Sequence, residues 1–304
     1  MKTKSHRFLV VDILLLLGAA LPLVAGLVLR VFTKPPSNGI EISGALVYAT
    51  IPLPFQDLPI TEAQINSALV IVTLLFVCLY FTHGLKTHPE LKRQLIAEWI
   101  VETCDGLVNQ NMGEYFTSFS PFIVGIMGLS AFSSLLSLIG LYPPTSDINI
   151  TAGWAILVFF LITFYKLKSG FGNYLKSFTE PIVVLLPLNI LGEVATPVSM
   201  AFRHFGNVLS GSVIAVLIST ALQGLSAILL SWLPGVLGEI PFLQIGIPAV
   251  LSLYFDIFSG ALQAFIFAML TMLNIAGAFS PEEYEKRQRK KQAKKLAKIN
   301  GGIE

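Results

Sequence analysis

The sequence predicts an all-α fold, a polytopic bundle of transmembrane helices with long tilted helices in its C-terminal half. Hydrophobic residues make up 54% of the 304 residues, charged residues only 12%, and the mean hydropathy is +0.74. A soluble domain would carry about twice that share of charged residues. Residues 63–85 and 204–238 contain no Asp, Glu, Lys or Arg, and each run exceeds the roughly 20 residues that cross a bilayer. This composition excludes disordered, collagen-like and disulfide-rich secreted proteins.

Six segments of the chain are long and apolar enough to span a bilayer. The first, residues 8–29, follows a basic start and is interrupted by Asp12. Residues 23–25 (LVA) would serve as the cleavage site of a signal peptide. However, the apolar stretch is longer than the usual length of about 7–15 residues, which favours a retained helix. The other spans are residues 63–85, 122–142, 152–165, one segment within 182–230, and 247–279.

The Lys and Arg residues between the spans predict the orientation. With six spans and the N-terminus inside, seventeen of the twenty Lys and Arg fall on the cytoplasmic side, so both termini are expected there. Residues 281–304 form a basic tail, with eight Lys or Arg against four Glu. A cytoplasmic tail beside anionic lipid explains these charges more simply than nucleic-acid binding. We therefore expect no nucleic-acid partner, and no labelling of residues 286–298 by an impermeant reagent from outside.

The segments between the spans contain one helical pattern. In residues 90–116 apolar side chains recur at helical spacing, which predicts an amphipathic helix on the membrane or against a partner; a connector covering the end of the bundle fits as well. Residues 35–39 and 143–147 are expected to form outward turns. Cys78 and Cys104 form no motif and are expected to be free thiols. No phosphate-binding loop, metal-ligand cluster or nucleophile–base set is present, so we expect neither a cofactor nor a self-contained active site.

The most informative residue is Arg203, because it lies inside a span. An Arg at the bilayer centre costs at least about 2.5–3.5 kcal/mol and cannot escape by losing its proton. Thr196, Ser199, Asn207 and Ser210 recur around it at three- and four-residue steps, which predicts one polar stripe on an apolar helix. Two facing polar stripes would form a water-filled path or an ion-handling surface. The second stripe, in the sixth span, consists of Ser252, Asp256, Ser259 and Gln263.

These polar side chains also have purely structural interpretations. Arg203 and Asp256 could form a buried ion pair that only fixes packing, and composition alone makes this as probable as a functional role. Glu193 lies nearly three turns from Arg203 and around 80° off its face. His204 points off the stripe, so a packing role is favoured over a proton relay.

Four small or amide residues predict how the two polar helices pack. Gly206 and Gly211 are expected to permit close helix approach. Asn207 and Gln263 can hydrogen-bond between helices, a contact worth only about 0.6 kcal/mol on average. We expect Gln263 to contact the Arg203 stripe, because both lie near the middle of their spans.

Three separated blocks of sequence resemble a known family. They are residues 197–199 (PVS) with 202–207 (FRHFGN) and Gly211, residues 262–267 (LQAFIF) with 270–271 (LT), and residues 144–149 (PTSDIN). Together they resemble subunit a of the F-type ATP synthase, the stator part of its membrane sector, over residues 61–280. Residues 1–60, an apolar helix and an outward loop, lie outside the resemblance, and residues 281–304 form the basic tail.

The resemblance implies ion translocation coupled to rotation. Arg203 would face a ring of c subunits and favour the ionised form of each membrane carboxylate in turn, while two half-channels deliver and remove the ion. It also implies peripheral-stalk b subunits as partners, and ATP chemistry on other subunits, so that the chain is not an enzyme by itself. The coupling ion, a proton or sodium, is selected by the ring and cannot be predicted here. The N-terminal segment favours the bacterial cytoplasmic membrane over an organelle.

The resemblance also assigns roles to single residues. Arg203, Asn207 and Gln263 carry over directly as ion-translocation residues. Asp256 stands where the family often has Glu or His, and Glu193 is a further candidate for ion translocation. The residues that would line a half-channel or only pack are Ser199, Ser210, Ser212, His204 and Ser259.

The chain departs from the family pattern at three positions. Ser212 stands where many members have Glu or His, Asn189 replaces a frequent Glu, and His204 replaces the more usual Leu. Fewer titratable groups are therefore expected along the ion route, and Glu193 or water would have to compensate.

Two other classes of function fit the polar residues taken alone. A secondary transporter would bind an anionic or zwitterionic solute with Arg203 and Asp256. A structural membrane anchor would tolerate Lys or Gln in place of Arg203. The transporter would work as this chain alone, whereas the stator requires a ring subunit.

Overall fold

The computed structural model describes most of the chain as helix. It covers residues 2–33, 44–54, 56–86, 92–179, 182–231, 241–244 and 246–279, together with 281, 284, 285 and 289. The expected turn at residues 35–39 and most of the basic tail lie outside these residues. The helical segments that are long and apolar enough to cross a membrane are Leu9–Thr33, Glu62–Thr82, Glu114–Ile139, Ile148–Ser169, Val183–Leu230 and Phe242–Ala278. The predicted all-α polytopic bundle is confirmed.

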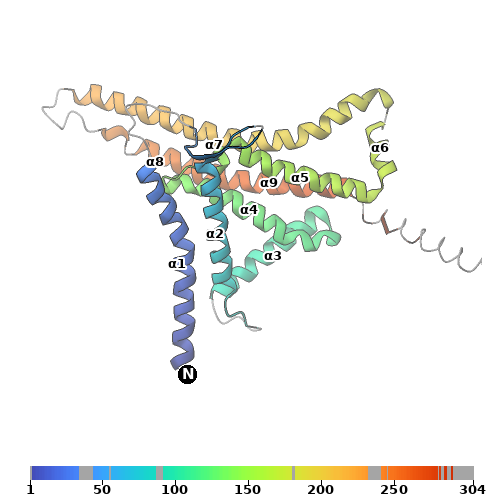
Figure 1. Ribbon diagram of the computed structural model, residues 1–304, viewed down its shortest axis with the longest axis horizontal. Helices are drawn as coiled ribbons and strands as arrows, with labels where there is room; N and C mark the ends of the chain where they lie inside the picture. The colour runs from blue at the N-terminus through green and yellow to red at the C-terminus, as the bar shows by residue number, and fades with distance from the viewer. Residues whose placement is uncertain are drawn as a thin grey trace, which may run out of the picture.

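The first two spans form a pair. α1 (Lys2–Thr33) and α2 (Glu62–Thr82) run side by side, and Figure 1 shows them crossing the direction of α5, α7 and α9. Before α2 the chain forms an antiparallel hairpin of β1 (Val47–Ile51) and β2 (Leu58–Thr61), which the sequence did not predict. β2 leads directly into α2, where the Thr61 backbone N–H donates to Gln64 Oε1 at 3.1 Å. This bond satisfies one of the free donors at a helix start.

The predicted amphipathic segment forms α3 (Lys92–Met112), followed by the 3-10 helix η1 (Glu114–Phe119). Cys104, Val108 and Met112 are buried against the bundle. Leu95 and Trp99, two other apolar residues of this helix, are exposed. The helix is confirmed, and whether its exposed apolar side chains meet the membrane or a partner stays a prediction.

The third span continues from η1 into α4 (Ser120–Leu135) and the 3-10 helix η2 (Leu136–Ile139). A further 3-10 turn, η3 (Pro144–Ser146), precedes α5 (Ile148–Ser169). Asp147 caps α5 by accepting a hydrogen bond from the Asn149 backbone N–H at 2.9 Å. The fourth span is thus longer at both ends than residues 152–165, because polar Asn149 and the basic residues after Tyr165 still belong to the helix.

The C-terminal half consists of long helices, as predicted. α6 (Phe171–Thr179) and η4 (Val183–Leu185) lead into α7 (Leu186–Leu230), one helix of 45 residues that bends in Figure 1. Its length of about 68 Å is more than twice the thickness of a bilayer core, so it must tilt strongly. The sixth span comprises η6 (Phe242–Gln244), α8 (Ile247–Ser252), the π-helix η7 (Leu253–Ser259) and α9 (Gly260–Ala278).

The main core lies where α3, α4, α5, α7 and α9 meet. α9 buries eight of its 19 residues there, including Phe267, Met272 and Ile275. α7 buries only five of its 45 residues. One long face of α7 is therefore uncovered by the described part of the chain.

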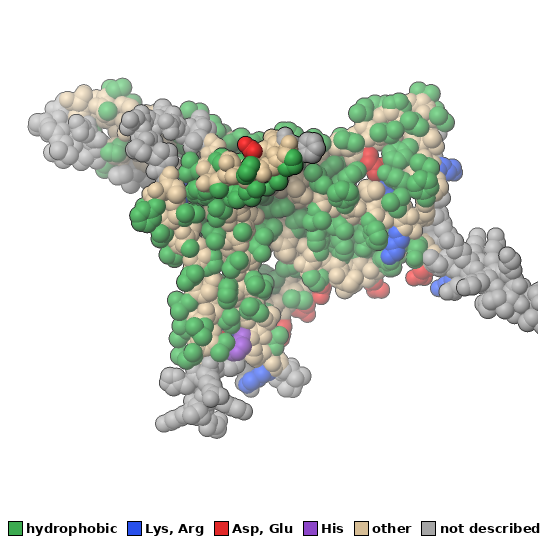
Figure 2. Space-filling model, viewed as in Figure 1, with side chains coloured by type: hydrophobic (Ala, Val, Ile, Leu, Met, Phe, Trp, Pro, Cys, Tyr) green, Lys and Arg blue, Asp and Glu red, His purple; other side chains and the backbone are tan. Residues whose placement is uncertain are grey.

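The surface of the molecule fits a lipid environment. Figure 2 shows hydrophobic side chains over most of the visible face, with the charged side chains gathered mainly along its lower and right-hand edges. Exposed apolar residues are expected on helices that face acyl chains rather than water.

Candidate functional site

Arg203 lies on the uncovered face of α7. Its side chain is exposed, and among the described residues it forms no hydrogen bond and no ion pair. The adjacent Phe202 is 59% exposed and Val198, one turn earlier, is 48% exposed. A guanidinium carries five N–H donors and a permanent charge. The side chain of Arg203 therefore needs a counter-charge, and the described residues do not supply one.

The other residues of the predicted stripe lie on the same open side. Ser199, Asn207 and Ser210 are exposed. The Ser210 hydroxyl donates to the Asn207 carbonyl of its own helix at 3.2 Å, and the Thr196 hydroxyl donates to the Gly192 carbonyl at 3.0 Å. Such local bonds satisfy small hydroxyls within a helix.

Asn207 joins the stripe to α9. Its Nδ2 donates to Gln263 Oε1 at 2.8 Å, and Gln263 is only 2% exposed. The predicted contact between Gln263 and the stripe is confirmed. A Cβ on Gly211 would lie 2.9 Å from the Phe255 ring, so α7 and η7 approach closely there, whereas a Cβ on Gly206 would meet open space. The expected close approach is confirmed at Gly211, whereas at Gly206 no described residue approaches and the expectation stays a prediction.

Asp256 does not pair with Arg203. It lies in the π-helix η7, and its Oδ2 accepts a hydrogen bond from the Ser252 hydroxyl at 2.5 Å. A π-helix closes i to i+5 bonds and has a wider turn than an α-helix. The predicted stripe from Ser252 to Gln263 assumed α-helical spacing. Because η7 has a wider turn, the polar residues before and after it do not lie on one face of the helix, and the sequence pattern could not reveal this. Ser259 is the last residue of η7 and is half-buried.

Glu193 has partners at the other end of the stripe. Its Oε1 lies 2.9 Å from Lys166 Nζ of α5 and accepts a hydrogen bond from the Tyr174 hydroxyl at 3.2 Å. Burial, and secondarily the Glu193 carboxylate, raise the pKa of the Tyr174 phenol. Lys166 and Glu193 line a cavity of about 260 Å³ together with Thr196 and Asn274. Asn274 was not identified from the sequence, and Lys166 was included only in the count of Lys and Arg on the cytoplasmic side.

Two other predicted or noted polar residues are satisfied locally. Ser212 is exposed and donates to the Leu209 carbonyl of its own helix at 2.8 Å. Asn189 donates to the Phe178 carbonyl at 2.8 Å, which ties the start of α7 to α6.

His204 points away from Arg203 into the core, as its position on the helix predicted. It is fully buried, its Nε2 lies 3.1 Å from Ser130 Oγ, and its ring meets Trp154 and Phe267 edge to face. His204 Nδ1 has no hydrogen-bond partner among the described residues. The packing role is therefore well supported by geometry, with one polar atom unsatisfied.

Ser130 belongs to a buried hydroxyl cluster that the sequence reasoning missed. Ser134 Oγ lies 3.4 Å from Thr145 Oγ1, and Tyr142 donates to the Ser146 carbonyl at 3.2 Å. Buried hydroxyls normally have a partner, and unsatisfied ones indicate sites for water or an ion. Two hydroxyls of the cluster have no partner among the described residues. The cluster consists of Ser130, Ser133, Ser134, Thr145 and Ser146, and the unsatisfied pair is Ser133 and Ser146.

Comparison with known proteins identifies relatives over most of the chain. Residues 65–276 match the family described as ATP synthase A chain. The sodium-ion-specific ATP synthase subunit a of Propionigenium modestum is 32% identical over 243 residues, covering 74% of this chain and 76% of that protein. The ATP synthase subunit a of Trichlorobacter lovleyi is 33% identical over 230 residues, covering 73% and 90%. That of Legionella pneumophila strain Philadelphia 1 is 27% identical over 228 residues, covering 74% and 90%.

Proposed function

Because the chain belongs to the ATP synthase A chain family and is a stator subunit of the F-type ATP synthase membrane sector, we propose that Arg203 couples its ion transport to rotation. The subunit is a multi-pass membrane protein that acts in ATP synthesis within a complex of membrane-sector subunits. ATP is made elsewhere in the complex, and this chain is non-catalytic by itself.

The observation that carries the proposal is the exposed guanidinium of Arg203 on α7, which has no ion-pair partner in the described part of the chain. Its partner is a membrane carboxylate on each subunit of the c-ring. When a ring carboxylate reaches Arg203, the opposite charge favours its ionised form and releases the bound ion. The next ring position then brings a new carboxylate to the same cation, so release is repeated as the ring turns.

Two half-channels reach this face from opposite sides of the membrane. On the inner side, the cavity beside Lys166, Glu193, Thr196 and Asn274 gives water and ions access to the stripe. On the outer side, the buried hydroxyl cluster between α4 and η3 leads toward His204. Arg203 lies between the two routes, and its fixed charge blocks direct passage of a cation from one to the other.

The remaining polar residues of the site position Arg203 or line the outer route. The Asn207–Gln263 bond holds α7 against α9 one turn from Arg203, so the guanidinium keeps a fixed place against the ring. Asp256, held by Ser252, adds a carboxylate to the outer half-channel. The exposed hydroxyls along the open face of α7 and at the end of η7 provide a polar lining: Ser199, Ser210, Ser212 and Ser259.

The subunit works in the bacterial cytoplasmic membrane with both termini in the cytoplasm, as the distribution of Lys and Arg indicates. Peripheral-stalk b subunits hold it against the ring's rotation. Each elementary charge that crosses 100 mV releases roughly 2.3 kcal/mol, so several ions are needed for one ATP. The coupling ion is a proton or sodium.

ATP-driven ion uptake into inverted membrane vesicles tests the proposal. Arg203→Ala should abolish uptake while the subunit still assembles with the ring, because no group in the described chain depends on this side chain. Val198→Ala, an exposed apolar residue of the same helix with no part in the ion route, is the matched control and should retain uptake. Normal uptake by assembled Arg203→Ala would refute the proposed role of Arg203. Solute transport by the purified chain without a ring would support the transporter instead.

A further inference from the structure

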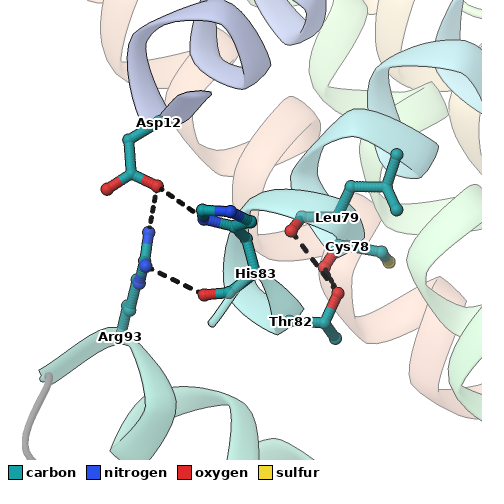
Figure 3. Close-up of polar contacts among 6 residues, drawn as sticks. All are labelled: Asp12, Cys78, Leu79, Thr82, His83 and Arg93. Carbon is teal, nitrogen blue, oxygen red and sulfur yellow. Dashed lines mark hydrogen bonds and ion pairs between the residues drawn. The ribbon is translucent and has the colours of Figure 1, made fainter. Parts of the chain in front are cut away.

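The N-terminal helix α1 carries an ionic contact that the proposed function does not use. Asp12 Oδ1 accepts a hydrogen bond from Arg93 Nη1 at 2.5 Å and lies 3.3 Å from His83 Nδ1. Arg93 Nη2 also donates to the His83 carbonyl at 2.9 Å (Figure 3). Asp12 therefore connects α1 to the end of α2 and to the first turn of α3.

A second ionic contact lies near the other end of α1, with the charges reversed. Arg30 Nη1 lies 3.3 Å from Glu62 Oε1, at the first residue of α2. The Glu62 side chain is only 3% exposed, while that of Arg30 is 26% exposed. Thus α1 contributes the anion to one contact and the cation to the other.

Between the two contacts α1 fits closely against α2. A Cβ on Gly18 would lie 2.6 Å from the Phe76 ring, and one on Gly26 would lie 2.7 Å from a Leu69 methyl carbon. Glycine is what allows such close approach of two membrane helices. The Thr73 hydroxyl also donates to the Ala19 carbonyl at 3.2 Å. The helices therefore meet along most of their length and not only at their ends.

These contacts bear on whether α1 is a removable leader. A signal peptide needs an apolar stretch and a cleavage site. It does not need charged side chains that pair with charged residues of the mature chain. If α1 were removed, Glu62 would be left buried without the cation beside it, and Arg93 would lose a carboxylate. A buried charge without a partner is costly, so α2 is built for a neighbour that supplies a cation beside Glu62.

We propose that α1 is a resident span of the mature subunit, and that Asp12 with Arg93 and Arg30 with Glu62 form an ion lock that fixes α1 against α2. The inner contact also fixes the start of α3. The outer contact lies one turn from Asn66, which donates to the Tyr142 carbonyl at 2.8 Å beside the buried hydroxyl cluster. The family match begins inside α2, at residue 65, so it covers neither Asp12 nor Arg30.

The mass of the mature chain gives the first test. The subunit purified within its complex should have the mass of a chain that retains residues 1–33. A chain that begins near residue 26, after the sequence LVA, would overturn the proposal. This reading does not depend on ion uptake, so it stays separate from the test of Arg203.

Charge exchange tests the lock itself. Asp12→Arg alone and Arg93→Asp alone should each lower the amount of assembled subunit in the membrane roughly fivefold or more, and the two changes combined should restore most of it. Lys92→Asp is the matched control for Arg93→Asp, because Lys92 is the preceding residue, is exposed, and has no ion pair among the described residues. Single variants as abundant as the Lys92→Asp control, or a double variant no better than the singles, would overturn the lock.

Discussion

Asp12 and Arg30 of α1 and Glu62 of α2 each lie beside an oppositely charged group of the same chain, whereas Arg203 near the middle of α7 has none among the described residues. Both regions are apolar helices of membrane-spanning length, and an unpaired charge is expensive in either. The chain can therefore neutralise a charge inside a span where two of its own helices meet. For an arginine left open on an uncovered face, the proposed function places the counter-charge on another subunit.

Burial separates the same two regions. The carboxylate of Glu62 lies almost completely out of contact with solvent, and its loss of water is offset by Arg30. Arg203 lies on the side of α7 that the described residues leave open. We therefore expect charge changes at the N-terminal pair to affect stability first, and a change at Arg203 to affect ion transport first.

The largest effect should come from Arg203→Gln, which keeps hydrogen-bond donors but removes the charge. Coupled ion uptake should fall to background, because a neutral amide cannot favour the ionised form of a ring carboxylate. The free energy of unfolding of the purified chain should change by less than about 0.5 kcal/mol, as for an exposed site without partners. Ion uptake in vesicles checks the predicted loss of transport, and unfolding in mixed micelles checks the predicted free energy of unfolding. If Arg203→Gln destabilised the chain but left ion uptake normal, Arg203 would be a structural residue, which would contradict the proposed difference between α7 and the α1–α2 pair.

The next effect is expected at Arg30→Gln, which leaves Glu62 buried without its cation. We expect the free energy of unfolding to fall by about 3 kcal/mol, the lower end for breaking a buried ion pair, because Arg30 is partly exposed. Unfolding in mixed micelles measures it. The double variant Arg30→Gln with Glu62→Gln should recover part of the loss, since no charge is then stranded. Equal losses in the single and double variants would show that the pair is not an electrostatic contact.

The features predicted correctly from the sequence are those that depend on the pattern of neighbouring residues. Span positions follow from apolar length, and the inward direction of His204 follows from its place next to Arg203 on a helix. Partners were harder to predict, because Asp12 and Arg93 are 81 residues apart and no period relates them. The π-helix was missed for a different reason: it changes the period on which the stripe through Asp256 was drawn.

Gly206 and Gly211 of α7 test whether the uncovered face begins where the structure places it. Gly211→Leu should push α7 away from Phe255 and lower the free energy of unfolding by about 1–3 kcal/mol, as overpacking does. Gly206→Leu should be tolerated, because its Cβ would meet no atom of the described chain within 4 Å. Unfolding of both variants in micelles provides the measurement. If Gly206→Leu folds normally in micelles but fails to assemble, the missing neighbour is another subunit.

The smallest effect concerns the bond between Asn207 and Gln263, which joins the open face of α7 to the buried face of α9. A double-mutant cycle with Asn207→Leu and Gln263→Leu should give a coupling free energy of about 0.6 kcal/mol, the average for hydrogen bonds between membrane helices. Ser210→Ala is a suitable control, because that hydroxyl bonds only within its own helix in the described structure. If the changes in free energy of unfolding of the two single variants simply add in the double variant, the bond is absent in the protein in micelles. A coupling near the average would mean that the bond adds little to stability, so any larger loss of ion uptake in the single variants must come from a displaced Arg203. Stability and position would then be separate contributions of the same contact: the interior helix provides the fixed point, and the exposed helix presents the charge.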